Sequence, residues 1–127
     1  MANILLVEDD SELRRALRLN LEGLGHRVVE AGDGREAMVI LRSVGADVVV
    51  TDIVMPEKEG LETIVELRRQ WPELPIVAMS GGGRVAPGLS LLAAQHLGAR
   101  RVLAKPFPVA ELDRAITELT RSGARGA

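Results

Sequence analysis

A chain of 127 residues, 46% of them hydrophobic and 27% charged, is long enough for one compact domain and too short for two of ordinary size. It has no cysteine, which excludes a disulfide framework, a thiolate metal site and a cysteine nucleophile. A formal net charge of −2 and only 2% aromatic residues argue against nucleic-acid binding by this chain. No apolar run approaches the ~18 residues of a membrane span. We therefore expect a cytoplasmic protein without a membrane partner.

Short apolar runs alternate with amphipathic segments along the chain. The runs predict strands at residues 4–7, 28–31, 48–51, 76–79 and 102–104. Apolar residues at helical spacing predict helices around residues 13–24, 37–44, 61–65, 89–97 and 109–119. Strands that are apolar on both faces are typical of a parallel sheet covered by helices on both sides. The sequence thus predicts an α/β fold with a doubly wound, five-stranded parallel sheet.

Local signals refine this pattern. Asp33 and Glu36 predict a capping pair at the start of the second helix. His96 is expected on the apolar side of the fourth helix, where it would pack rather than bind a metal. Apolar periodicity ends near the C-terminus, so we expect one domain over residues 1–121 and a disordered tail or truncated linker over residues 122–127.

Polar residues follow four of the predicted strands directly. They are Glu8, Asp9 and Asp10 after the first, Asp52 after the third, Ser80 after the fourth and Lys105 after the fifth. The carboxyl ends of parallel strands share one edge of a sheet, where such folds bind ligands. Right-handed crossovers make the first and third strands neighbours, so Asp52 should face the acidic triplet. Crowded carboxylates need a hard cation, and oxygen ligands without His or Cys favour Mg²⁺.

The same edge suits phosphoryl chemistry. Lys105 supplies a cation and Ser80 a hydroxyl donor, which with the metal can hold the oxygens of a phosphoryl group. Asp52 would attack an activated phosphoryl donor in line and form an acyl phosphate, with no general base. Each residue alone has an ordinary explanation as a turn, a cap or a surface charge, and their coincidence at the strand ends favours function. Asp10 stays open between a further acidic site residue and the cap of the first helix.

Four segments also occur in a distinctive order and spacing. They are LLVEDD at residues 5–10, VTDIVMP at residues 50–56 with Gly60, MSG at residues 79–81 and KPF at residues 105–107. Together they resemble the receiver domain of bacterial two-component response regulators, over about residues 3–120. Each segment is weak alone, whereas the four together are specific. The resemblance implies the flavodoxin-like (βα)5 fold with strand order 2-1-3-4-5.

The resemblance also implies a metal site. Asp52 would be the phosphoacceptor and, with Asp9, a direct ligand of Mg²⁺. Glu8 would act mainly through a metal-bound water, and the backbone carbonyl of Val54 would complete the protein ligands.

For the phosphoryl group, the resemblance implies contacts to Ser80 and Lys105 and a cis peptide bond before Pro106. The donor would be a histidine kinase, a histidine phosphotransfer protein or a small acyl phosphate. Such a partner would dock on the first helix, where Leu13, Arg14 and Leu17 are candidate contacts, although core packing is the better interpretation of Leu17.

Phosphorylation would change the face formed by the fourth helix, fifth strand and fifth helix, which would bind a downstream protein. A homodimer is also left open. Val102 stands where many family members carry an aromatic switch residue, so the route to this face is in question.

Other functions remain to be weighed. The chain would be either a single-domain regulator or the isolated receiver of a larger one, and not an enzyme beyond promoting its own phosphorylation and dephosphorylation. One alternative is a receiver-like binding or dimerisation module that no longer cycles. Another is a Mg²⁺-dependent phosphatase with an aspartyl nucleophile, which is disfavoured because Val54 stands where such enzymes place a second acid.

Overall fold

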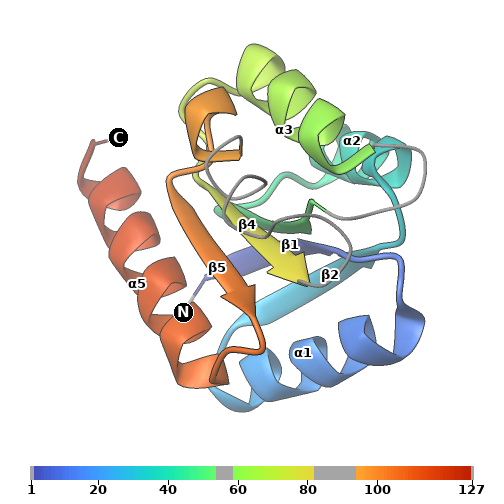
Figure 1. Cartoon of the computed structure of the whole chain (residues 1–127). Coiled ribbons are helices and arrows are strands. Elements are labelled where there is room, and N and C mark those ends of the chain that lie inside the picture. Colours follow the sequence, from blue (N-terminus) through green and yellow to red (C-terminus); the bar gives the residue numbers. More distant parts are fainter. Residues whose placement is uncertain (1, 54–58, 82–93, 127) are drawn as a thin grey trace.

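The computed structural model describes residues 2–53, 59–81 and 94–126. Its strands form one parallel sheet: β1 (Asn3–Val7), β2 (Arg27–Ala31), β3 (Val48–Asp52), β4 (Ile76–Gly81) and β5 (Arg101–Lys105). The five strands lie in the order β2-β1-β3-β4-β5, which confirms the predicted fold class and strand order (Figure 1). The helices are α1 (Ser11–Gly23), α2 (Gly34–Ser43), α3 (Glu59–Gln70) and α5 (Val109–Gly126), and residues 94–97 are also helical.

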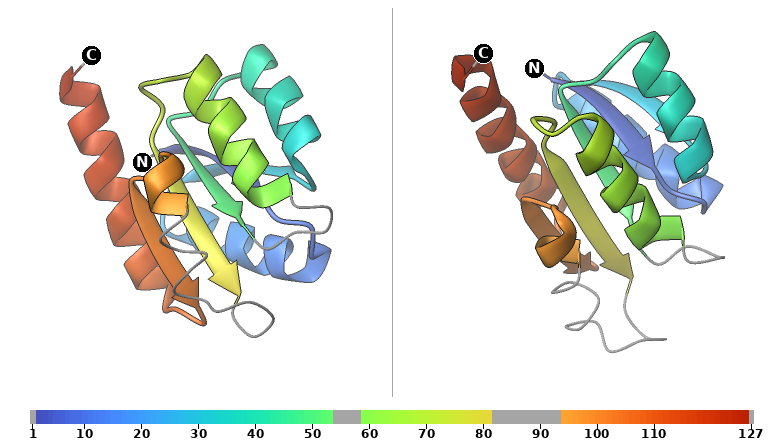
Figure 2. Two further views of the ribbon diagram at one scale, coloured as in Figure 1. Left: turned by 45° about the horizontal axis from the view of Figure 1, so that its top comes forward. Right: turned by 90° about the horizontal axis from the view of Figure 1, so that it is seen from above.

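Helices cover both faces of the sheet, and each face has its own hydrophobic core. Figure 2 shows α2 and α3 side by side on one face, while α1 and α5 pack on the other. Successive residues of a strand point to opposite faces. Val49 accordingly belongs to the core that contains Ile64 of α3, and Val50 belongs to the core that contains Ile116 of α5. Every residue of the central strand β3 is buried, as its continuous apolar run predicts.

The start of α2 shows how local chemistry places an element. The Glu36 backbone N–H donates to Asp33 Oδ1 at 2.8 Å, and the Glu36 carboxylate accepts from the Gly32 N–H at 2.5 Å. The predicted capping pair is therefore confirmed, with its second bond made to Gly32. Gly34 follows, and a Cβ there would overlap the Thr63 hydroxyl of α3. Glycine is required because the two helices approach closely at this point.

Two expectations about the C-terminal third need correction. His96 is exposed, so its predicted place on the apolar side of the fourth helix is wrong. Ala94 and Leu97, three residues apart and so on one helix face, make the core contacts instead. In addition, α5 continues to Gly126 where we expected a disordered tail from residue 122, because extending an existing helix costs little per residue. The domain bounds themselves stay a prediction.

Among the helices of the described residues, none is both long enough and apolar enough to cross a bilayer.

Candidate functional site

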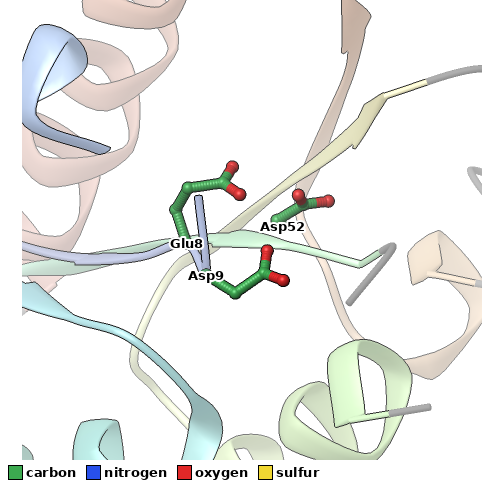
Figure 3. Close-up of side chains that lie close together, drawn as sticks. All are labelled: Glu8, Asp9 and Asp52. Atoms are coloured by element: carbon green, nitrogen blue, oxygen red, sulfur yellow. The ribbon is translucent and has the colours of Figure 1, made fainter. Parts of the chain in front are cut away.

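Acidic side chains from two neighbouring strands meet at the carboxyl edge of the sheet. β1 and β3 pair in parallel, with Val7 opposite Thr51, so Glu8 and Asp52 follow side by side. One carboxylate oxygen from each of Glu8, Asp9 and Asp52 lies within 4.8 Å of the other two (Figure 3). The predicted meeting of Asp52 with the acidic residues after the first strand is thus present in the structure.

A lysine from the edge strand enters this acidic group. Lys105 Nζ donates to Glu8 Oε1 at 2.8 Å and to Asp52 Oδ2 at 3.2 Å. The Glu8 residue is 1% exposed and the Asp52 residue 4% exposed, so both carboxyl groups are largely removed from water. A buried charge is costly unless it is paired, and Lys105 supplies that pairing.

Burial and neighbours shift the proton affinities in this group. Burial raises the pKa of Glu8, the negative charge of Asp52 adds to the rise, and the Lys105 hydrogen bond opposes it, leaving a pKa of about 7. Burial alone would lower the pKa of the Lys105 ammonium. The hydrogen bond from Lys105 to Glu8, together with the charges of Asp52 and Glu8, outweighs burial and raises that pKa above its usual value.

The donor set fits a hard divalent cation. Three carboxylates converge there, and Asp9 is exposed, so the group is open to solvent on its side. Carboxylate oxygens together with retained waters satisfy the octahedral demand of Mg²⁺. The residues present therefore suit the predicted metal.

The remaining predicted site residues have different positions. Ser80 is buried near the end of β4, where it pairs in register with Ala104, the residue before Lys105. The Lys105–Pro106 peptide bond is cis, as the resemblance implies. Val54, the expected carbonyl ligand, lies outside the described residues.

Asp10 caps α1. Its Oδ1 accepts from the backbone N–H groups of Glu12 and Leu13 at 3.1 and 3.2 Å. It is exposed and lies outside the acidic group formed by the described residues. Of the two interpretations left open, the structure supports the helix cap.

Comparison with known proteins identifies the family. The family model of the response regulator receiver domain matches residues 4–117. The chain belongs to this family. Phosphorylation is inherent to receiver domains, which are signalling modules of two-component systems.

Curated relatives of this receiver domain include regulatory proteins of bacteria. The chain is 36% identical over 112 residues to the KDP operon transcriptional regulatory protein KdpE of Escherichia coli, covering 88% of this chain and 48% of that protein. It is 38% identical over 118 residues to the response regulator MprA of Mycolicibacterium vanbaalenii, covering 93% of this chain and 50% of that protein. The chain therefore spans about half the length of the curated relatives it matches.

Solved structures agree on the fold of the receiver domain. A response regulator receiver domain protein from Clostridium thermocellum superposes with a TM-score of 0.90 at 26% identity, covering 100% of both chains. The receiver domain of NtrX from Brucella abortus gives a TM-score of 0.85 at 28% identity, covering 93% of this chain and 98% of that one.

One contact at the receiver site was missed by sequence reasoning. Arg14, expected as a partner contact on α1, donates from Nη1 to the Glu8 carbonyl at 2.7 Å and from Nε to Glu30 Oε1 at 2.6 Å. Glu30 lies on β2, 16 residues from Arg14, and no helical or strand periodicity links the two positions. The one sequence feature that could have indicated this contact is the position of Glu30 near the carboxyl end of β2, the strand that pairs with β1.

Proposed function

We propose that this receiver domain is the phosphoacceptor of a two-component phosphorelay, with Asp52 as the acceptor and Mg²⁺ as the cofactor. The observation that carries the proposal is the meeting of Glu8, Asp9 and Asp52 within 4.8 Å, with the Lys105 ammonium 3.2 Å from Asp52 Oδ2. An oxygen nucleophile, oxygen ligands for a metal and a cation are then all at one edge of the sheet. Phosphoryl transfer depends chiefly on such positioning and charge.

The chemical step uses the carboxylate itself. An Asp52 oxygen attacks phosphorus, the P–N bond of a phosphohistidine or the P–O bond of a small acyl phosphate breaks, and the bonding pair leaves with the donor. No base is needed because Asp52 reacts as a carboxylate. The Lys105 ammonium offsets negative charge on the phosphoryl oxygens, and the Ser80 hydroxyl donates to one of them.

Mg²⁺, when bound, would neutralise charge on the phosphoryl oxygens and hold them in place. Asp9, Asp52 and the Val54 carbonyl would be its direct protein ligands, and Glu8 would act through water.

The proposed output is a change of binding surface. Lys105 ends β5, and Ser80 pairs with its neighbour Ala104, so both phosphoryl-binding residues belong to the strand pair next to α5. New bonds to the phosphoryl group would shift the population of conformations of the face formed by the helix that includes residues 94–97, β5 and α5. Val102 is half-buried in the core on the α3 side and carries no ring, so this shift would not use an aromatic switch.

The proposed partners follow from this role. A histidine kinase or histidine phosphotransfer protein would supply the phosphoryl group, and a downstream protein, or a second copy of the chain, would bind the altered face. We place the protein in the cytoplasm and assign no direct nucleic-acid binding to this chain, whose net charge is −2.

The test is the intact mass after incubation with a small acyl phosphate and Mg²⁺. We expect one added phosphoryl group on the wild type, and none with chelator or on Asp52→Asn. Asp10→Asn is the matched control, because asparagine caps a helix as well as aspartate does. It should be modified like the wild type.

A folded wild type that gains no phosphoryl group would contradict the proposal unless inorganic phosphate accumulates. Steady release of phosphate would indicate rapid turnover of the acyl phosphate, or the alternative phosphatase activity if added phosphate monoesters are also hydrolysed. Absence of both adduct and release would favour the module that no longer cycles.

A further inference from the structure

Arg14 links three parts of the molecule. It belongs to α1, its Nε donates to Glu30 Oε1 of β2 at 2.6 Å, and its Nη1 donates to the backbone carbonyl of Glu8 at 2.7 Å. The Arg14 side chain is 20% exposed and the Glu30 side chain 21% exposed, so this is a largely shielded ion pair. Hydrogen bonds from a charged donor in such a setting are stronger than neutral ones.

Glu30 is itself held from both sides. Its second carboxylate oxygen, Oε2, lies 2.7 Å from Nη1 of Arg18, one helical turn after Arg14. Nη1 of Arg14 also lies beside Gly32, where an added Cβ would be 3.4 Å away, in van der Waals contact. These contacts fix the position of the Arg14 guanidinium.

The carbonyl that Arg14 holds belongs to the peptide between two residues of the acidic group. The Glu8 N–H already donates to the Ala31 carbonyl of β2 at 3.0 Å, so with Arg14 both backbone groups of Glu8 are anchored. The peptide unit is planar, and fixing the Glu8 oxygen fixes the direction in which the chain continues to Asp9. Within the described ranges, the exposed Asp9 carboxylate makes no hydrogen bond of its own. Its position depends on this backbone.

We propose that Arg14, held by Glu30, is a positioning residue that sets the Glu8–Asp9 peptide in the orientation from which Asp9 binds a divalent cation. This inference rests on the proposed Mg²⁺ site. Arg14 touches neither the cation nor the phosphoryl group and acts through the backbone. Groups that orient metal ligands in this way typically contribute about 10–100-fold to metal affinity.

The first experiment measures Mg²⁺ affinity by calorimetry. Arg14→Met keeps the aliphatic length and removes the donors, and we expect it to weaken binding by roughly tenfold or more. Arg14→Lys should fall between, because an ammonium on a flexible stem does not reproduce the forked geometry of a guanidinium. The matched control is Arg15→Met. Arg15 is the exposed next residue and makes no hydrogen bond or ion pair within the described residues, so its removal should leave affinity within about twofold.

The second experiment examines the metal-free protein. It distinguishes a general loss of stability from a change in the orientation of the Glu8–Asp9 peptide. The backbone amide NMR signals of Asp9 and Asp10 should shift in Arg14→Met and not in Arg15→Met. Circular dichroism must show that both variants are folded. If Arg14→Met does not fold, Arg14→Lys and Glu30→Gln carry the comparison and should each weaken Mg²⁺ binding.

The outcomes separate this inference from the proposed function. If a folded Arg14→Met variant binds Mg²⁺ as tightly as the wild type does, the inference about Arg14 is overturned and the phosphoacceptor role of Asp52 is unaffected. A wild type that binds Mg²⁺ but accepts no phosphoryl group would overturn that role, while the comparison of affinities would still decide the part played by Arg14. A wild type that binds no Mg²⁺ would overturn both.

Discussion

At the scale of single residues, Glu8 is a buried carboxyl group whose ionisation is set by opposing neighbours. Burial raises its pKa to about 7, Asp52 acts in the same direction, and the Lys105 hydrogen bond acts against them. A carboxyl group in the unfolded chain has its ordinary, lower pKa. The folded state therefore binds the Glu8 proton more tightly than the unfolded state does.

This difference predicts a pH dependence of the metal-free protein. Because the pKa of Glu8 is higher in the folded than in the unfolded state, binding of its proton stabilises the fold. This stabilisation is complete below pH 4.5, the pKa in the unfolded chain, and is lost as the pH rises through about 7, the pKa in the folded chain. In chelator, we expect the free energy of unfolding to fall by about 1–3 kcal/mol between pH 5 and pH 7.5 on account of this group. Urea unfolding at several pH values measures it. Glu8→Gln, which has no proton to lose, should remove that part of the slope; an unchanged slope would show that another group causes it.

His26 is the second residue with a defined electrostatic role. It is 7% exposed, its Nδ1 accepts from the Ala2 N–H at 3.1 Å, and its Nε2 lies 2.6 Å from Asp113 Oδ1 of α5. The first contact makes Nδ1 the acceptor, so Nε2 carries the proton and donates to Asp113. This ring joins the start of the chain to α5.

We predict that His26→Ala lowers the free energy of unfolding by about 1–3 kcal/mol, because the Ala2 N–H loses its buried partner. Chemical denaturation measures the change. His96 offers the control, since it is exposed, and His96→Ala should alter stability by no more than about 0.5 kcal/mol. Equal effects of the two variants would refute the assigned role of His26.

At the scale of elements, the contact between α2 and α3 depends on one missing side chain. Gly34 begins α2 and is buried, and a Cβ there would meet Oγ1, Cβ and Cγ2 of Thr63 in α3. The severe clash is with the Thr63 hydroxyl oxygen, and the contacts to Cβ and Cγ2 at 3.2 and 3.3 Å are also tight, so turning the hydroxyl away leaves the space crowded. Packed interiors tolerate such added volume poorly.

Gly34→Ala should therefore lower the free energy of unfolding by about 1–3 kcal/mol, despite the better helix propensity of alanine. Gly23→Ala is the matched control: it lies at the end of α1 with nothing within 4 Å of an added Cβ, and it should be neutral or slightly stabilising. Thermal melts of both variants decide the point. The double variant Gly34→Ala/Thr63→Ala should recover part of the loss, and no recovery would place the strain elsewhere.

At the scale of the whole molecule, the acidic group joins strands that lie between two cores. Glu8 follows β1 and Asp52 ends β3, while residues of both strands contribute to the hydrophobic core on each face. A ligand that holds these strand ends together binds only the folded chain. Its binding free energy is then added to the stability of the entire domain.

Mg²⁺ at about 100 times its dissociation constant should raise the free energy of unfolding by about 2.7 kcal/mol. The rise reverses on addition of chelator, and it should be much smaller in Asp9→Asn, which lacks a direct ligand. A thermal shift assay over a range of Mg²⁺ concentrations measures it. A melting temperature that does not change with Mg²⁺ concentration would contradict the proposed metal site.

Much of the fold was predictable because its signals are local. The run at residues 48–51 predicted a strand buried on both faces, and Val48–Asp52 is such a strand. Side-chain direction on the fourth helix was less predictable. The placement of His96 was wrong because one short periodic segment fits several faces, and packing selects among them.

The candidate site shows the same division. Sequence order and parallel-sheet geometry were enough to bring Asp52 beside Glu8 and Asp9, because polar residues directly after strands must reach the same edge. The distinction between Asp10 as a ligand and as a cap needed its hydrogen bonds to α1. The anchoring of the Glu8 carbonyl by Arg14 needed the meeting of α1 with β2.

The sequence by itself determined the alternation of strands and helices, the family and the residues at the strand ends, since each follows from neighbours along the chain. The tertiary structure alone decided which charges are buried, which are paired and which proton is held more tightly on folding. These depend on distances between elements far apart in sequence, such as the 2.8 Å from Lys105 to Glu8. Electrostatic energy varies with distance and with exclusion of water, and both are created only when the chain folds.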